Sequence, residues 1–186
     1  MRTKDENKVK AIKQAVIELC DTIGLANMTT AKVAKEAGVS PATIYLYYQD
    51  KTDLLSRLYE EVKDDLHRGL AGAITAAGDD VTAQLRAMLQ FSVDRAREFP
   101  KESHFVSTLW TSQELLDDAA KASGNTAPGP LLTLYQRLQA DDKIVDAPIP
   151  VLAAFASVPT LILQTADDDA ASLTQAIDLV VKALMK

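Results

Sequence analysis

The chain has little of what marks a secreted, membrane-spanning or disulfide-bonded protein. Its 186 residues include a single cysteine, so no internal disulfide can form. No apolar run approaches the ~18–20 residues that a membrane-spanning helix needs. The first residues, MRTKDENKVK, are polar and lack the apolar region of a signal peptide. We therefore expect a cytoplasmic protein that does not span a membrane.

The usual motifs of catalysis and metal binding are also missing. No glycine-rich phosphate loop, nucleophile elbow or HExxH spacing occurs. The two histidines, His67 and His104, fall on different predicted helices, and Cys20 is expected to be packed in the first helix. The acidic run Asp167–Asp169 has no accompanying histidine, and negative charge is favoured at a helix start. We predict that the protein is not an enzyme and uses no metal or cofactor.

The net charge differs in sign between the first part of the chain and the rest. Residues 1–51 carry eight Lys or Arg and six Asp or Glu, a net charge of +2. The rest carries 12 and 20, a net charge of −8. A mildly basic head on an acidic body suggests that only the head binds a polyanion. Chance variation along the chain explains a difference of this size equally well.

Apolar residues recur at spacings of three and four, the period of an amphipathic helix, in most of the chain. Such stripes cover residues 9–23, 54–74, 81–96, 131–138 and 173–184. The stretch 150–165 is almost continuously apolar, and Pro159 predicts a kink or an early break in it. A short helix capped by Thr111 is expected near 115–119, and a loop at 123–130. Because no strand pattern of any length occurs, the predicted fold class is all-α.

The segment Thr29–Leu55 has the sequence TTAKVAKEAGVSPATIYLYYQDKTDLL. One of the two threonines that open it is suited to cap a short helix, and Gly38 to the sharp turn that follows. Ser40 is suited to cap a second helix with Pro41 as its first residue. Two short helices joined by a three- to four-residue turn with a glycine form a helix-turn-helix.

Helical spacing predicts which side chains of the second helix face inward. Ile44 and Tyr48 lie four residues apart and are expected to pack against Val33 and Val39. Hydroxyl groups on the exposed side suit phosphate oxygens, and small or apolar side chains suit the thymine methyl group in the major groove. The exposed side consists of Pro41, Ala42, Thr43, Tyr45, Leu46 and Tyr47. The alternative is that the two exposed tyrosines only cover the neighbouring long helix.

Asp50 is expected to cap the helix that follows, which puts Lys51 in its first turn. A lysine there opposes the helix dipole unless it meets an anion, and a helix N-terminus is itself an anion site. Lys51 is therefore expected to clamp a DNA phosphate.

Over about residues 8–60 the sequence resembles the TetR family of bacterial transcriptional repressors. The threonine pair followed by VAKEAGVS, TIYLYY and QDKTDLL carries the resemblance. It implies a three-helix DNA-binding head, expected at residues 1–50, on an all-α body at 51–186 that holds an effector pocket and a dimer surface. The family's DNA-contacting positions correspond to Thr30, Ala31, Pro41, Ala42, Thr43, Tyr45, Leu46, Tyr47 and Lys51.

Two residues depart from the family pattern. Leu46 stands where many members have a histidine or another hydrogen-bonding group, and Ala31 where some have a base-reading arginine. We expect an operator read largely through thymine methyl contacts, phosphate positioning and DNA shape.

The body offers candidates for a dimer surface and an effector pocket. Residues 150–164 are too apolar to leave exposed, which together with the resemblance favours a dimer formed by the two C-terminal helices over simple core burial. The pocket candidates are aromatic residues, a methionine and a histidine, any of which could equally be ordinary core or surface: Met88, Phe91, His104, Phe105, Trp110, Tyr135 and Phe155.

The resemblance favours a repressor that binds a palindromic double-stranded DNA operator as a homodimer and is released by a small-molecule effector. The rival interpretation is an all-α interaction module that acts through its C-terminal helices without sequence-specific DNA binding.

Overall fold

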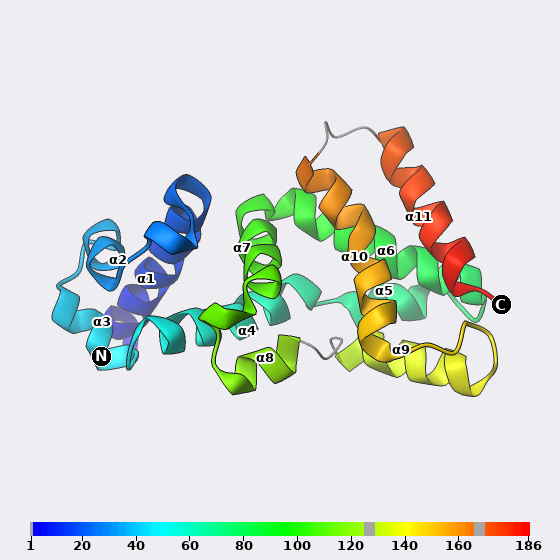
Figure 1. The fold of residues 1–186 in the computed structure, drawn as a ribbon, viewed down its shortest axis with the longest axis horizontal. Helices are drawn as coiled ribbons and strands as arrows, with labels where there is room; N and C mark the ends of the chain where they lie inside the picture. The colour runs from blue at the N-terminus through cyan, green and yellow to red at the C-terminus, as the bar shows by residue number, and fades with distance from the viewer. Residues whose placement is uncertain (1, 125–128, 166–169) are drawn as a thin grey trace. The chain divides into compact units, whose positions relative to one another are not determined.

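A computed structural model describes residues 2–124, 129–165 and 170–186 (Figure 1). Within these residues the predicted all-α class is confirmed, with one isolated bridge between Ile144 and Met185 as the β-type pairing. The elements are α1 (Arg2–Ile23), η1 (Leu25–Asn27), α2 (Thr30–Glu36), α3 (Pro41–Tyr47), α4 (Lys51–His67), α5 (Leu70–Ala76), α6 (Val81–Glu98), α7 (Pro100–Thr111), η2 (Gln113–Leu115), α8 (Asp118–Gly124), α9 (Gly129–Ala140), α10 (Ile149–Thr165) and α11 (Ala170–Leu184).

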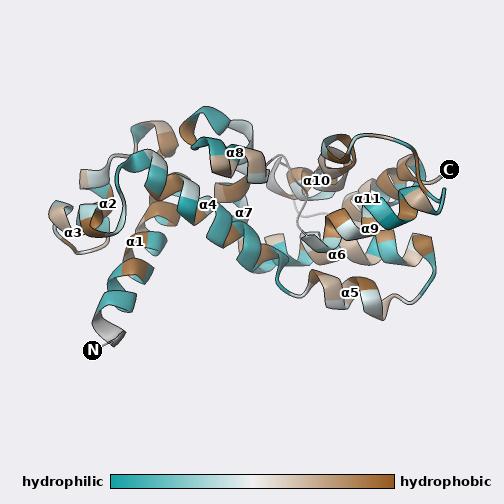
Figure 2. Ribbon diagram, turned by 90° about the horizontal axis from the view of Figure 1, so that it is seen from below, coloured by the Kyte–Doolittle hydropathy of each residue, from teal (hydrophilic) through white to brown (hydrophobic). Residues whose placement is uncertain are grey.

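The helices pack into two compact units. The first consists of residues 1–63 and 101–121, and the second of residues 64–100 and 122–186. Hydrophilic and hydrophobic residues alternate along α1 and α4, as expected of amphipathic helices (Figure 2). None of the described helices is long and apolar enough to cross a membrane.

In the first unit, α2 packs against both α1 and α3. Helix α7 also belongs to this unit, although no sequence pattern indicates that it packs with the N-terminal helices. Its Lys101 ammonium lies 2.6 Å from a carboxylate oxygen of Glu18 and 3.7 Å from one of Asp21, both on α1. Beyond α7, the backbone N–H of Asp117 donates to the Ser56 hydroxyl on α4 at 2.9 Å. These contacts tie residues 101–121 to the N-terminal helices.

The second unit is built around one hydrophobic cluster to which α5, α6, α9, α10 and α11 contribute. Tyr135 of α9 belongs to this cluster and is fully buried, and its hydroxyl donates to the Leu152 carbonyl of α10 at 3.3 Å. Helix α6 packs against α5, α10 and α11. Figure 1 shows α10 and α11 side by side over α6.

Several predicted helix boundaries are wrong. The stripe predicted at 54–74 is two helices, because Gly69 adopts a left-handed φ of 99° and separates α4 from α5. Helix α10 continues through Pro159, so the early break does not occur, while the kink predicted as its alternative stays a prediction. Thr111 is the last residue of α7 and caps nothing, since its hydroxyl donates to carbonyls of the preceding turn. Of the predicted loop at 123–130, residues 125–128 lie outside the described residues, as does the run Asp167–Asp169, and the other four residues belong to α8 and α9 instead of a loop.

Candidate nucleic-acid interface

The first helix of the predicted helix-turn-helix begins and ends as its sequence indicates. Thr29 has an extended backbone, and its hydroxyl accepts a hydrogen bond from the backbone N–H of Lys32 at 3.2 Å, which satisfies one free donor at the start of α2. Gly38 follows α2 with a φ of 66°, a conformation that side chains with a Cβ rarely adopt. The Val39 N–H then donates back to the Ala34 carbonyl at 2.9 Å and closes the turn.

The second helix starts at Pro41, three residues after that glycine. The Ser40 hydroxyl accepts from the Thr43 backbone N–H at 3.2 Å, and Pro41 occupies the first helical position. Ile44 is fully buried and Tyr48 is nearly so, which confirms their predicted inward orientation. The Arg57 guanidinium stacks 5.0 Å from the centre of the Tyr48 ring. The inner face of α3 is thereby fixed against the rest of the unit.

The outer face of α3 is left uncovered. Tyr45 is 55% exposed and Leu46 is 77% exposed, and Pro41 and Ala42 are exposed as well. Tyr47 is half-buried. Of the remaining predicted contacts, Ala31 is exposed at the start of α2, whereas Thr30, Thr43 and Lys51 are half-buried.

Each hydroxyl on α3 already has a partner within the protein. Tyr45 and Thr30 share a hydrogen bond of 3.0 Å between their hydroxyls, which links α3 to α2. Tyr47 donates to a carboxylate oxygen of Asp5 at 3.2 Å, which links α3 to α1. Partial desolvation and the Asp5 carboxylate raise the pKa of Tyr47, so its hydroxyl stays protonated at neutral pH. Both tyrosines are thus held in place before any ligand arrives.

Lys51 also has an internal partner. Its ammonium donates to the Leu25 carbonyl at 2.8 Å, and this carbonyl belongs to η1, just after α1. Desolvation by partial burial lowers the pKa of the ammonium. The predicted cap of α4 is present, since Asp50 accepts from the Asp53 backbone N–H at 2.9 Å. Lys51 therefore joins the start of α4 to η1, and its predicted phosphate contact stays a prediction.

Two residues with contacts to α3 were missed by the sequence analysis. Asp5 is the acceptor for Tyr47, and Arg57 donates to the Tyr47 carbonyl at 2.7 Å, where the last turn of α3 leaves that oxygen without a helical partner. Arg57 also lies four residues after Asp53, whose carboxylate is 3.8 Å away. That i, i+4 spacing is a sequence signal for Arg57, but no signal pointed to Asp5.

The predicted effector-pocket residues do not gather in one unit. His104, Phe105 and Trp110 are on α7 in the first unit, and Phe105 is fully buried there. Met88 and Tyr135 are buried in the hydrophobic cluster of the second unit, and Phe91 packs against it. Phe155 is 43% exposed on α10.

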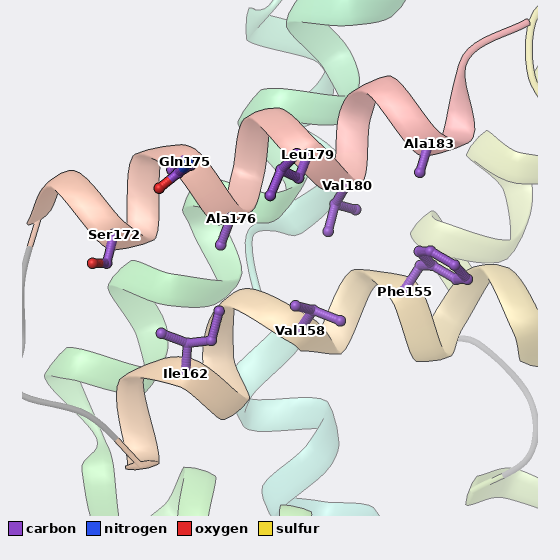
Figure 3. Close-up of a pocket in the computed structure, with 9 residues that line it drawn as sticks. All are labelled: Phe155, Val158, Ile162, Ser172, Gln175, Ala176, Leu179, Val180 and Ala183. Atoms are coloured by element: carbon purple, nitrogen blue, oxygen red, sulfur yellow. The ribbon is translucent and has the colours of Figure 1, made fainter.

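A pocket of about 580 Å³ lies between α10 and α11, and Phe155 is the one predicted pocket residue that lines it. Figure 3 shows that side chains of both helices, among them Val158 and Val180, extend into the space between α10 and α11. The lining is mainly apolar: Phe155, Val158, Ile162, Ser172, Gln175, Ala176, Leu179, Val180 and Ala183. Nearby Val151 and Leu161 are also exposed, and Leu179 is 60% exposed. Among the residues that the structure describes, no three His, Cys, Asp or Glu side chains are grouped to hold a metal ion.

Comparison with known proteins identifies the helix-turn-helix segment. Residues 13–58 match the family model described as bacterial regulatory proteins, tetR family. The HTH-type transcriptional regulator BetI of Stenotrophomonas maltophilia is 35% identical over 99 residues, 53% of this chain and 50% of that protein. The nucleoid occlusion factor SlmA of Mannheimia succiniciproducens is 27% identical over 128 residues, 66% of this chain and 57% of that protein. The chain spans about half the length of the curated relatives it matches.

Solved structures extend the likeness to the whole chain at the level of fold. A TetR family transcription regulator from Marinobacter aquaeolei aligns over 100% of both chains with a TM-score of 0.82 and 24% sequence identity. The all-α body therefore has a known fold as well as the head.

Proposed function

The chain is a member of the TetR family of bacterial transcriptional regulators, and from this premise we propose that it represses transcription as a homodimer bound to a palindromic DNA operator. A small-molecule effector releases the dimer from the operator. In this proposal residues 1–50 bind the DNA and residues 51–186 bind the effector and the second copy. The protein acts in the cytoplasm and catalyses no reaction.

The observation that carries the DNA-binding proposal is the uncovered outer face of α3. An α-helix fits the major groove of B-DNA, and α3 presents Ala42, Tyr45 and Leu46 to solvent while its inner face is packed. Leu46 is 77% exposed, and its contact with another surface would lower the free energy by removing apolar surface from water. The half-buried Thr43, Tyr47 and Lys51 flank this face, where they support phosphate contacts that fix the register on the duplex.

The exposed apolar side chains of α10 and α11 support the homodimer. Apart from two residues of α3, the large hydrophobic side chains exposed in the described part of the chain all lie on these two helices: Val151, Phe155, Leu161 and Leu179. Covering them with the same helices of a second copy removes apolar surface from water in a two-fold arrangement. Two heads about one helical turn apart, ~34–36 Å, then bind a palindrome.

Release by an effector requires a difference in binding between two conformations. The effector must bind the form that does not bind DNA more tightly, and ~1–3 kcal/mol of coupling is typical. Met88 and Tyr135, buried in the second unit, are candidates that an effector reaches only if the helices around them separate. Trp110 is the sole tryptophan, so its fluorescence reports effector-induced changes around α7.

The test is selection of bound duplexes from a random DNA pool at moderate salt, with a Tyr47→Ala, Lys51→Ala double variant in parallel. We expect the wild type to enrich a palindrome and the variant to lose it. Lys51→Ala alone reduces the slope of log affinity against log salt by about one if the ammonium neutralises one phosphate. Circular dichroism and thermal unfolding check that the variants fold, since both side chains have partners within the head.

No enrichment at any salt, with or without candidate effectors, contradicts the repressor proposal and favours the interaction module acting through α10 and α11. Sedimentation of the same wild-type sample then reports whether those helices still hold two copies together.

A further inference from the structure

Helix α3 lacks every side chain that reads a base edge with paired hydrogen bonds. Its seven residues, PATIYLY, include no Arg or Lys for guanine, no Asn or Gln for adenine and no Asp or Glu for cytosine. Its polar side chains are Thr43, Tyr45 and Tyr47. Sequence reading by this helix must therefore use hydroxyl groups or apolar contacts.

The hydroxyl groups are already engaged. Thr43 and Ser40 share a hydrogen bond of 2.9 Å at the start of α3, and Tyr45 shares one of 3.0 Å with Thr30. Tyr47 donates to Asp5 at 3.2 Å. The one proton of Tyr47 is committed to Asp5, and in each of the two pairs one hydroxyl donates to the other, so using a committed proton to read a base breaks an existing bond and gives a small net gain.

Three exposed side chains without polar groups remain on the helix: Pro41 at its first position, Ala42 and Leu46. Ala42 and Leu46 lie four residues apart and therefore on one face of α3. Side chains with that spacing have Cβ atoms about 5–6 Å apart, which compares with ~3.4 Å between successive base pairs. They can contact bases one or two steps apart on one strand.

We propose that Ala42 and Leu46 select thymine at two positions of each operator half-site by packing against its C5-methyl group. Thymine alone among the four bases presents a methyl group in the major groove, and apolar side chains recognise it. This inference rests on the proposed function and specifies how it reads sequence: the half-site carries thymine where these two residues face the bases.

The test uses the operator enriched by the wild-type protein. Each thymine of the half-sites is replaced in turn by deoxyuridine, which removes the methyl group and leaves the hydrogen-bonding edge unchanged. Affinities are measured for the wild type, for Leu46→Ala and for Glu36→Gln. The last variant is the control, since Glu36 is exposed on α2 and is not one of the proposed DNA contacts.

We expect deoxyuridine at the position facing Leu46 to weaken wild-type binding about fourfold per half-site, the effect of one buried methyl-sized group. Leu46→Ala is expected to bind the thymine and deoxyuridine operators within about twofold of each other, whereas Glu36→Gln keeps the wild-type discrimination. Thymines outside the contacted positions serve as the DNA control and tolerate the replacement.

Equal wild-type affinity for both operators, or an enriched site with guanine or cytosine at the positions facing residues 42 and 46, overturns this inference while the DNA-binding function stands. Failure to enrich any duplex overturns the proposed function and this inference together.

Discussion

At the scale of single residues, Asp5 places a negative charge beside a predicted phosphate contact. Its carboxylate accepts the Tyr47 hydroxyl and lies 3.6 Å from the Lys8 ammonium. We predict that Asp5→Asn strengthens operator binding up to about fivefold at low salt, because the amide still accepts the hydrogen bond but no longer repels DNA phosphates. Fluorescence anisotropy at 50 and ~200 mM salt checks this, since screening reduces the gain.

Weaker binding by the Asp5→Asn variant at both salt concentrations contradicts that prediction. It would mean that the Asp5 charge matters mainly for holding Tyr47. Glu6→Gln is the matched control, because Glu6 is exposed at the adjacent position of α1 and its replacement by glutamine removes the same negative charge.

Cys20 gives a residue-scale prediction about pH. Burial, aided by the neighbouring Asp21 carboxylate and opposed by a hydrogen bond with Thr108, raises the pKa of the thiol from 9.0 to about 11. The native thiol should therefore not react with a thiol reagent at pH 8, whereas urea-unfolded protein reacts readily. Because the folded pKa is the higher one, this group's contribution to stability is present below pH 9 and is lost as the pH rises toward about 11. Rapid labelling of the folded protein at pH 8 would contradict the prediction.

At this scale the sequence predicts local contacts and misses distant ones. The cap at Ser40 and the inward orientation of Ile44 depend on residues within one or two helical turns, so spacing alone predicts them. The partners of Tyr47 and Lys51 are 42 and 26 residues away in the chain. Such pairs depend on how α1 packs against α3 and α4, which no local pattern encodes. Whether the proposed residues contact DNA is a further question that the selection experiment answers.

At the scale of elements, the break between α4 and α5 depends on one glycine. A Cβ built on Gly69 would lie 3.5 Å from the Phe91 ring, which is an ordinary van der Waals distance. The obstacle to a side chain at this position is therefore strain of the backbone and not a steric clash. We predict that Gly69→Ala lowers the free energy of unfolding by about 1–2 kcal/mol, the penalty of a left-handed conformation for an L-residue. Urea denaturation measures the change.

Gly72 is the matched control for that substitution. It lies inside α5 with an ordinary helical backbone, and nothing is within 4 Å of a Cβ built on it. Gly72→Ala should therefore raise the free energy of unfolding by about 0.5–1 kcal/mol. Two changes of the same sign would contradict the assignment of Gly69 as the residue that ends one helix and starts the next.

Gly69 also explains why the sequence predicted one helix from 54 to 74. The apolar stripe continues in phase from α4 into α5, so periodicity does not reveal a break that a single left-handed residue makes. The early break predicted at Pro159 errs in the opposite direction, because α10 contains this proline within its length. Periodicity predicts that an apolar face exists, but the backbone conformation of a few residues decides where a helix ends.

At the scale of the whole molecule, the proposed repressor depends on the homodimer. A single head contacts only a few base pairs. When two heads are held together, the second one binds its half-site intramolecularly, so the affinity of the dimer exceeds that of one head. Leu179, which is 60% exposed on α11, is a central residue of the proposed interface because it lines the pocket between α10 and α11. Disrupting it should therefore weaken DNA binding without touching the head.

We predict that Leu179→Glu makes the protein monomeric and weakens operator binding at least tenfold, because a carboxylate buried in an apolar interface remains unpaired. Thr174→Glu is the matched control, since it adds the same charge to an exposed position of α11 outside the pocket lining. Sedimentation gives the mass of each variant, and thermal unfolding shows whether the monomer stays folded. If Leu179→Glu remains a dimer with wild-type affinity, the interface lies elsewhere, and the exposed face of α10 and α11 is free to bind a different partner.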